Sequence, residues 1–254
     1  MNASNNIQQP KKFNILLIGD NCVDEYHYGT VDRISPEAPV PVFNLSYNET
    51  KPGMAANVMI NLDKLGCDIN FLCGETSTKT RLIDLRSKQH IIRIDNDKES
   101  NPITIATAIP NTYDAVVFSD YNKGTVSYEL IEQIRQEYQG PIFVDTKKTD
   151  LARLEGCIVK INRLEHSLLK SQCTDLIVTL GSEGAVYKNK TYETVDVEVV
   201  DVCGAGDTFL AALVYQYLQT GSIDRAIEFA NIAASITVQH TGVYAPTLEE
   251  ISQC

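Results

Sequence analysis

Two glycines and an acid stand together in the run Asp201-Val202-Cys203-Gly204-Ala205-Gly206-Asp207-Thr208-Phe209. Glycine lets backbone N–H groups approach a ligand closely, and the first turn of a helix presents unpaired N–H donors to an anion. Asp207 falls at the first turn of the helix that residues 209–218 predict, where it stays ionised and can take a proton from a hydroxyl. The pattern predicts a cradle for a phosphate or a transition state, with a general base attached. The same residues are equally compatible with a tight turn in which Asp207 only caps the helix.

A second glycine precedes a helix in the run Lys51-Pro52-Gly53-Met54-Ala55-Ala56-Asn57. Apolar residues recur at helical spacing as far as Leu65, and Gly66 fits the position just beyond the helix end. A glycine before small residues again allows a ligand to approach the backbone. Tight packing of the helix on a sheet gives the same pattern, and this run alone favours packing.

Polar residues follow five apolar segments that have the length of buried strands. The residues are Asp20, Asp120, Asp145, Asn162 and Gly181, after strands expected at 13–18, 115–118, 141–144, 158–161 and 176–180. Continuous apolar strands that alternate with helices predict an α/β fold whose parallel sheet is covered on both faces. Ligands bind such sheets at the carboxyl ends of the strands, so we expect these residues to lie around one site.

Other segments predict the elements around this sheet. Residues 26–47 are rich in Tyr, Val and Pro, and the prolines exclude a helix and favour extended structure. Residues 80–85 and 90–95 predict a hairpin. The remaining expectations are a strand at 67–73, a joint at 74–77, a β-like segment at 191–200, helices at 127–138 and 223–239, and a last helix that starts at Thr247 with Glu250 at capping-box spacing.

The composition is that of a globular chain, with 254 residues of which 43% are hydrophobic and 22% charged. A formal net charge of −11 makes the chain a poor candidate for binding a nucleic-acid backbone. The seven cysteines are odd in number and lack CxxC spacing, which favours reduced thiols over disulfides or a zinc site. Residues 1–12 are expected to form a flexible polar tail. Since no apolar run has the length of a membrane span, we expect a cytoplasmic protein.

Along nearly its whole length the chain resembles the ribokinase-like (PfkB) carbohydrate kinases. Residues 201–208 are similar to the C-terminal signature of that family, residues 53–57 to its N-terminal glycine signature, and Asn162-Arg163-Leu164-Glu165 to its N-x-x-E element. The run Arg33-Ile34-Ser35-Pro36-Glu37-Ala38-Pro39-Val40-Pro41-Val42 resembles the D-glycero-D-manno-heptose-7-phosphate kinase branch, as does Ser119-Asp120-Tyr121-Asn122-Lys123-Gly124. The resemblance implies a three-layer α/β sandwich with a mostly parallel central sheet. It also implies one kinase domain over 13–254, with a small β lid formed by about 22–50 and 78–96.

The resemblance further implies a role for each candidate residue. Asp207 would deprotonate the C1 hydroxyl of a heptose 7-phosphate as it attacks the γ-phosphate of ATP, and the amides of Gly204, Ala205 and Gly206 would stabilise the developing charge. The remaining candidates are Asp24, Gly53 and Asn57 for sugar hydroxyls; Lys79, Arg81, Arg93 and Lys123 for the substrate's phosphate; Gly181, Gly184, Asn231 and Ala234 for the adenine side; and Asn162 with Glu165 for Mg²⁺ through water. The alternative for the four cations is a solvated surface position.

The implied cofactors are ATP and Mg²⁺, with a monovalent cation as a third candidate. The implied partners are a sugar phosphate and ATP, with neither nucleic acid nor membrane, and a homodimer would pair through the β lid. The product, heptose 1,7-bisphosphate, is a precursor of nucleotide-activated heptose for lipopolysaccharide.

Three features depart from the family pattern. Met54 stands where a second glycine is usual, Cys203 stands where Thr is common, and Gly74 runs almost directly into Thr78, where the family has a helix-containing segment. Cys203 is also expected to have a lowered pKa, because it lies near a helix N-terminus.

Two alternatives stay open beside the heptose kinase. One is a kinase of this family for another sugar or a nucleoside, and the other is a non-catalytic sensor of sugar phosphates or nucleotides. Asp207 argues against a sensor, because a pure binder needs no base. A dinucleotide-dependent dehydrogenase is disfavoured, because the first strand is followed by Gly19-Asp20-Asn21-Cys22 and not by a glycine-rich fingerprint.

Overall fold

The computed structural model describes residues 12–105 and 111–253, so the tail expected at 1–12 lies outside the described residues except for Lys12. The strands are β1 (Asn14–Ile34), β2 (Pro41–Met54), β3 (Asp68–Asp84), β4 (His90–Asn96), β5 (Ala115–Asp120), β6 (Ile142–Thr146), β7 (Ile158–Asn162), β8 (Leu176–Thr179), β9 (Ala185–Tyr187) and β10 (Lys190–Tyr192). They form one ten-stranded sheet in the order β10-β9-β8-β7-β6-β5-β1-β3-β4, with β2 paired to β1. The pairs from β3 through β1 and β5 to β8 are all parallel.

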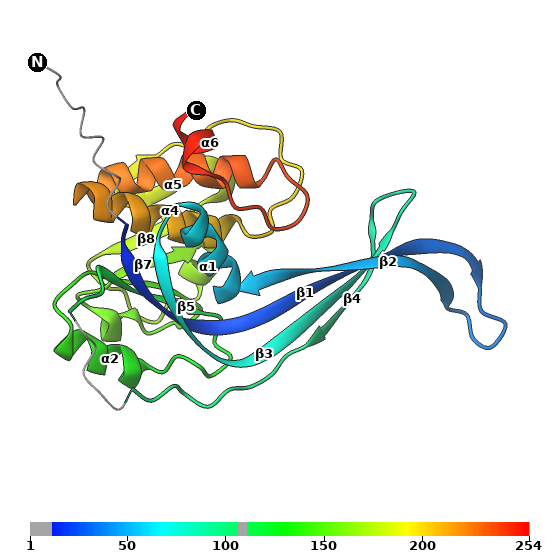
Figure 1. Ribbon diagram of the computed structural model, residues 1–254, viewed down its shortest axis with the longest axis horizontal. Coiled ribbons are helices and arrows are strands. Elements are labelled where there is room, and N and C mark those ends of the chain that lie inside the picture. Colours follow the sequence, from blue (N-terminus) through cyan, green and yellow to red (C-terminus); the bar gives the residue numbers. More distant parts are fainter. Residues whose placement is uncertain (1–11, 106–110, 254) are drawn as a thin grey trace, which may run out of the picture.

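Helices cover both faces of this sheet. They are α1 (Ala55–Lys64), α2 (Tyr128–Glu137), α3 (Arg163–Ser167), α4 (Ala205–Thr220), α5 (Ile223–Thr237) and α6 (Leu248–Ser252), with short 3₁₀ turns η1 (Leu151–Leu154) and η2 (Gly181–Glu183). Figure 1 shows α1, α4, α5 and α6 gathered on one side and α2 on the other. Successive strand residues point to opposite faces, so Leu17 packs in the cluster with α4 and α5, whereas Ile18 packs in the cluster with α2. The expected three-layer α/β sandwich is confirmed.

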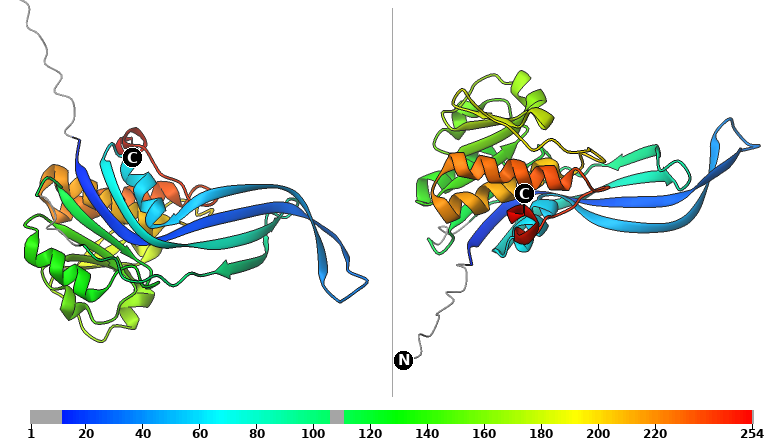
Figure 2. Two further views of the ribbon diagram at one scale, coloured as in Figure 1. Left: turned by 60° about the horizontal axis from the view of Figure 1, so that its bottom comes forward. Right: turned by 90° about the horizontal axis from the view of Figure 1, so that it is seen from above.

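Two strands leave this sandwich and continue well beyond it. β1 and β3 stay paired from Asn14↔Asp68 to Gly29↔Asp84, with one irregularity after Gly19. After this irregularity, β1 also pairs with β2 and β3 also pairs with β4, both in antiparallel fashion. The four strands project away from the helices (Figure 1, and both views of Figure 2). We call residues 21–54 and 76–96 the β-extension.

The continuity of β1 and β3 corrects two sequence-based expectations. The first strand does not end at residue 18 as expected, and residues 74–77 are no joint, because both stretches are inside strands. Their backbone groups find ladder partners in each other and in β2, so the chain has no reason to turn there. The expected hairpin is confirmed, with Arg81 opposite Arg93 across β3 and β4.

The β-like segment expected at 191–200 is also corrected, because only β10 is a strand there. At the end of β10 the side-chain amide of Asn231 donates to the carbonyl oxygens of Tyr192 at 2.9 Å and Glu193 at 3.2 Å. Val195, Val197 and Val199 line a cavity. The alternation of valines and acids in this segment therefore serves a cavity wall and not a sheet.

The helix expected at 209–218 begins earlier, because α4 starts at Ala205. Gly204 precedes it with φ of 78°, a left-handed conformation that glycine adopts without strain. Gly206 and Asp207 therefore belong to the helix itself. The capping box between Thr247 and Glu250 is confirmed at the start of α6.

Asp20 lies within β1 and organises the loop that follows β5. Its carboxylate is 1% exposed, and it accepts hydrogen bonds from the backbone N–H groups of Tyr121 at 2.8 Å, Lys123 at 3.1 Å and Thr125 at 3.3 Å. Asp20 was expected among the ligand-facing residues at a strand end. The structure gives it instead the task of holding residues 121–125 against the sheet.

Replacement of Asp20 by alanine should destabilise the fold, because it leaves buried N–H donors without an acceptor. Such a loss typically costs about 1–3 kcal/mol. Urea unfolding at pH 7, followed by linear extrapolation, measures it. Asp68→Ala is the control, because that carboxylate is 60% exposed and pairs with Lys12, a kind of contact worth about 0–1 kcal/mol. Equal effects of the two substitutions would contradict the anchoring role of Asp20.

Candidate active site

Asp207 is the central acid of the site, and it is buried, with 5% of its surface exposed. Its carboxylate accepts from the Asn57 side-chain amide, with 2.9 Å between Nδ2 and Oδ2, and from the Tyr121 hydroxyl, with 2.8 Å to Oδ1. Burial raises the pKa of Asp207 to about 6, against the opposing effect of these two donors. The group is therefore ionised at neutral pH and close enough to its pKa to exchange a proton.

The turn before Asp207 brings backbone close to neighbouring side chains. A Cβ on Gly204 would lie 2.8 Å from the Asn57 amide nitrogen, and a Cβ on Gly206 would lie 3.0 Å from the Lys160 ammonium. The amide of Ala205 makes a long bond of 3.4 Å to the carbonyl oxygen of Val202. Larger side chains would fill this space, so the glycines keep the N-terminus of α4 open to a ligand.

Lys160 is a buried cation next to this turn, and the sequence-based candidates did not include it. Its ammonium group donates to Asp145 at 2.8 Å and to the carbonyl oxygen of Gly206 at 3.3 Å. Burial alone would lower the pKa of Lys160, but the Asp145 carboxylate more than offsets this and the pKa is raised. A lysine inside the apolar run of β7 was the available signal.

Asp207 lines two cavities, and another cavity adjoins one of them at Gly206. The first has a volume of about 420 Å³ and is lined by Asp24, Gly53, Met54, Tyr121, Cys203, Gly204 and Asp207, together with basic and acidic side chains. Six of the seven residues predicted to bind the substrate lie around it: Asp24, Gly53, Lys79, Arg81, Arg93 and Lys123. Asn57 is not among the lining residues, since its amide points at Asp207.

The cations of the first cavity are paired with carboxylates. Arg81 contacts Asp24 at 2.6 Å, and both side chains are less than 10% exposed. Lys79 lies 3.3 Å from Asp95 and 3.2 Å from Asp97. The remaining pairs are Arg93 with Asp95 at 2.7 Å and Lys123 with Asp97 at 2.5 Å. The side chains of Lys79 and Arg81 are only 13% and 8% exposed, so the alternative of freely solvated surface cations does not describe these two, whereas the Arg93 side chain is 49% exposed.

The second cavity, of about 210 Å³, is a largely apolar slot. All four residues predicted for the adenine side line it: Gly181, Gly184, Asn231 and Ala234. Phe209 and several valines complete its walls. Gly184 has φ of 82°, and a Cβ there would lie 2.0 Å from the carbonyl oxygen of Tyr192, so only glycine fits this wall.

The third cavity, of about 110 Å³, lies between the other two and shares Gly206 with the slot and Asp207 with the first cavity. Asn162 and Glu165 line it and form a capping box at the start of α3. Glu165 also accepts from the Lys147 ammonium at 2.9 Å. In residues 12–105 and 111–253 no three His, Cys, Asp or Glu side chains group closely enough to hold a metal ion directly.

Cys203 corrects an expectation. Burial, with smaller contributions from Asp201, raises the pKa of its thiol to about 11. The expected lowered pKa was wrong, because desolvation outweighs the nearby helix N-terminus. Of the six cysteines in the described ranges, only Cys73 is exposed, and all six are free thiols. Cys254 lies outside those ranges.

Met54 stands at the entrance of α1 with φ of 53°. A non-glycine residue adopts this region at a cost, which explains why a glycine suits the position. The methionine lines the first cavity and is 7% exposed. It therefore reduces the space beside Gly53.

The mostly parallel α/β sandwich has adjoining cavities at the carboxyl ends of its strands. A helix N-terminus and a buried carboxylate lie at these cavities. Such a site is suited to an anionic small molecule. Residues 152–251 match the profile of the pfkB family carbohydrate kinases. Bifunctional protein HldE from Nitratiruptor sp. is 33% identical, over 94% of this chain and 64% of its own length. That alignment covers 299 positions, so roughly 60 of them have no counterpart in this chain.

Solved structures agree in fold. Ribokinase from Thermotoga maritima superposes with a TM-score of 0.69 at 16% identity, over 96% of this chain and 99% of its own. Ribokinase from Arabidopsis thaliana, solved with ribose and ATP, gives 0.68 at 15% identity over 96% and 98%. The chain has the ribokinase fold, and its residues 152–251 carry the profile of the pfkB family carbohydrate kinases. It spans about 64% of the length of the curated relative from Nitratiruptor sp.. No helix in the described ranges is long and apolar enough to cross a membrane.

Proposed function

We propose that the protein transfers the γ-phosphate of ATP to the C1 hydroxyl of a heptose 7-phosphate, in the cytoplasmic synthesis of nucleotide-activated heptose for lipopolysaccharide. The observation that carries the proposal is the position of Asp207. It lies between the cation-rich first cavity and the third cavity, which adjoins the apolar second cavity. A sugar phosphate fits the first cavity and adenosine fits the slot. The resemblance of residues 33–42 to the heptose kinase branch supports the choice of sugar.

The chemistry follows from the residues around the third cavity. Asp207 takes the proton of the acceptor hydroxyl, and its pKa of about 6 leaves it ionised at neutral pH. The amides at the start of α4 stabilise the charge that develops on the transferred group. Lys160 adds positive charge beside Gly206, which suits a reaction that depends on positioning and charge neutralisation.

Mg²⁺ would be held through water and not by direct ligands. Both carboxylate oxygens of Glu165 already accept hydrogen bonds, from the Asn162 backbone and from Lys147. Mg²⁺ keeps several waters when it binds with few carboxylates, so Asn162 and Glu165 fit an outer-sphere role. Bound there, the ion would neutralise negative charge on the nucleotide phosphates.

The substrate's phosphate would lie among Lys79, Arg81, Arg93 and Lys123. Lys79 and Lys123 both contact Asp97, so a phosphate dianion would compete with that carboxylate for them. The remaining carboxylates hold the cations in position before the substrate arrives.

A panel of sugars and sugar phosphates with ATP, read as ADP release, tests the function. Heptose 7-phosphate should give the highest kcat/KM, and this kcat/KM should fall as the pH drops through about 6, because Asp207 must be ionised to act as base. Asp207→Asn should lower kcat by about 10²–10⁴-fold while ATP binding persists. Near-wild-type kcat would remove Asp207 as the base.

Other results of the same panel would redirect the proposal. Faster turnover of a pentose, a fructose phosphate or a nucleoside would show that Met54 and the direct run from Gly74 to Thr78 serve another acceptor. ATP or sugar-phosphate binding without turnover of any acceptor would favour the sensor.

Lys79→Met and Lys123→Met should raise KM for the phosphorylated sugar by about 10–100-fold each, because each removes a charged hydrogen bond to the phosphate. The KM for the same sugar without its phosphate should stay unchanged. Lys12→Met removes an exposed lysine paired with Asp68 and is the control. Equal effects on both sugars would contradict a phosphate site among these lysines.

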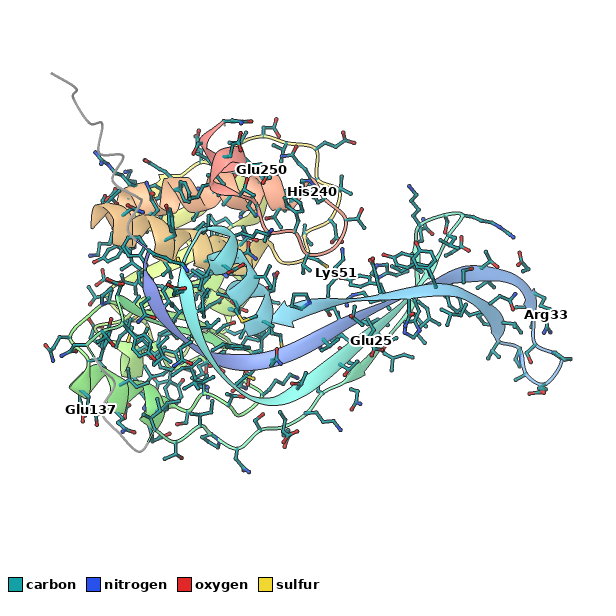
Figure 3. The ribbon with its side chains drawn as sticks, in the orientation of Figure 1. Glu25, Arg33, Lys51, Glu137, His240 and Glu250 are labelled. Atoms are coloured by element: carbon teal, nitrogen blue, oxygen red, sulfur yellow. The ribbon has the colours of Figure 1, made fainter. Side chains whose placement is uncertain are left out.

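We also propose a homodimer that pairs through the β-extension. Ile92 and Ile94 lie on one face of β4 and are each 51% exposed, and Leu45 and Tyr47 of β2 are exposed as well. Exposed apolar clusters mark interfaces. In Figure 3 the labelled Arg33 lies at the far end of this extension, away from the helices.

Ile92→Lys with Ile94→Lys should convert the dimer to a monomer in light scattering, because it buries charge at the interface. Leu168→Lys, at an exposed apolar position on the sandwich, should leave the mass unchanged. A monomeric wild-type protein would end the proposal, as would a double variant that stays dimeric.

A further inference from the structure

Both carboxylate oxygens of Asp207 accept hydrogen bonds from side chains that lie in separate parts of the chain. Asn57 reaches Oδ2 from α1, and Tyr121 reaches Oδ1 from the segment that follows β5. Two donors on different oxygens fix the rotation of a carboxylate. A second lone pair on each oxygen stays free for an acceptor hydroxyl.

Each donor is itself held in place. The Asn61 side chain donates to the Asn57 backbone oxygen at 2.8 Å and to its Oδ1 at 3.3 Å, so the Asn57 amide N–H is turned toward Asp207. The backbone N–H of Tyr121 is tied to Asp20 at 2.8 Å. The Lys147 ammonium lies 5.0 Å from the centre of the Tyr121 ring. The tyrosine is therefore anchored at its backbone and contacted at its ring.

The charge of Asp207 needs such support because the group is buried. Burial raises its pKa and the neighbouring Asp145 on β6 raises it further, while Asn57, Tyr121 and Lys160 on β7 lower it. Of these, Tyr121 alone lines both the first and the third cavity together with Asp207. Burial and the Asp207 charge also hold the pKa of the Tyr121 phenol well above its usual value, so the hydroxyl stays a donor throughout the working pH range.

We infer that Tyr121 is a positioning residue for the base. Its hydroxyl holds Asp207 in one orientation and favours the charged carboxylate. Its ring separates the first cavity, which would hold the acceptor, from the third cavity, where the phosphoryl group would be transferred. The inference rests on the proposed role of Asp207 as base. It requires a tyrosine at this position and not simply a flat ring, because the hydrogen bond carries the effect.

Tyr121→Phe keeps the ring and the Asp20 anchor and removes only the donor. Hydrogen bonds to charged groups are strong enough that the acidic limb of kcat/KM should move up by about one pH unit. Turnover should then fall about tenfold at pH 5 and less than twofold at pH 8, because Asp207 recovers its charge as the pH rises. A loss of the same size at every pH would show a merely structural role. An unchanged or faster reaction would show that the acceptor hydroxyl displaces Tyr121.

Tyr187→Phe is the matched control. Tyr187 donates to Asp175 at 2.6 Å, so this variant also loses a tyrosine–aspartate hydrogen bond, but on β9 and outside the three cavities. Its pH profile should match the wild type.

A second readout needs no turnover. ¹³C NMR of the aspartate carboxyl carbons follows the titration of Asp207 directly, with its signal identified by its absence in Asp207→Asn. The midpoint should rise by about one pH unit in Tyr121→Phe and stay constant in Tyr187→Phe. If the wild type phosphorylates no sugar, the proposed function fails while this titration still decides the role of Tyr121. An unmoved midpoint would overturn the inference even in an active kinase.

Discussion

The constraint on which this site depends is the burial of one negative charge. Asp207 is almost fully removed from water, and an ionised carboxylate is costly there unless it is hydrogen-bonded. Asn57, Tyr121 and, at a greater distance, Lys160 supply that compensation from α1, from the loop after β5 and from β7. The charge of Asp207 at the start of α4 therefore depends on donors that other elements of the sandwich supply. A carboxylate whose pKa lies near neutrality is the chemical consequence of this balance.

The paired strands β1 and β3 connect this centre to the β-extension. Together they carry Asp20, which holds the Tyr121 loop, and a few residues further on Asp24 and Arg81, which line the first cavity. One pair of strands thus positions both the anchor of the Tyr121 loop and a wall of the first cavity.

The sequence predicted much of the sandwich because its signals are local. The apolar strands β5 to β8, the cap of α6 and the glycine-bounded turn before α4 each depend on residues close in the chain. The errors arose where partners are distant. Residues 74–77 have the sequence of a joint but form part of β3, because they pair with β1. Residues 193–200 alternate like a strand but line a cavity and pair with no strand. Cys203 lies near a helix N-terminus, but the packing around it reversed the direction of its pKa shift.

By itself the sequence determined the fold class, the glycine-bounded turn and the acid most suited to be a base, since these follow from residue type and spacing. Only the tertiary structure decided what surrounds that acid. Asn57 turned out to hold Asp207, Asp20 to hold a loop, and Lys160 to lie beside Gly206. The physical reason is that the cost of a buried charge depends on donors and neighbours brought from as far as 150 residues away along the chain, and no local pattern contains that information.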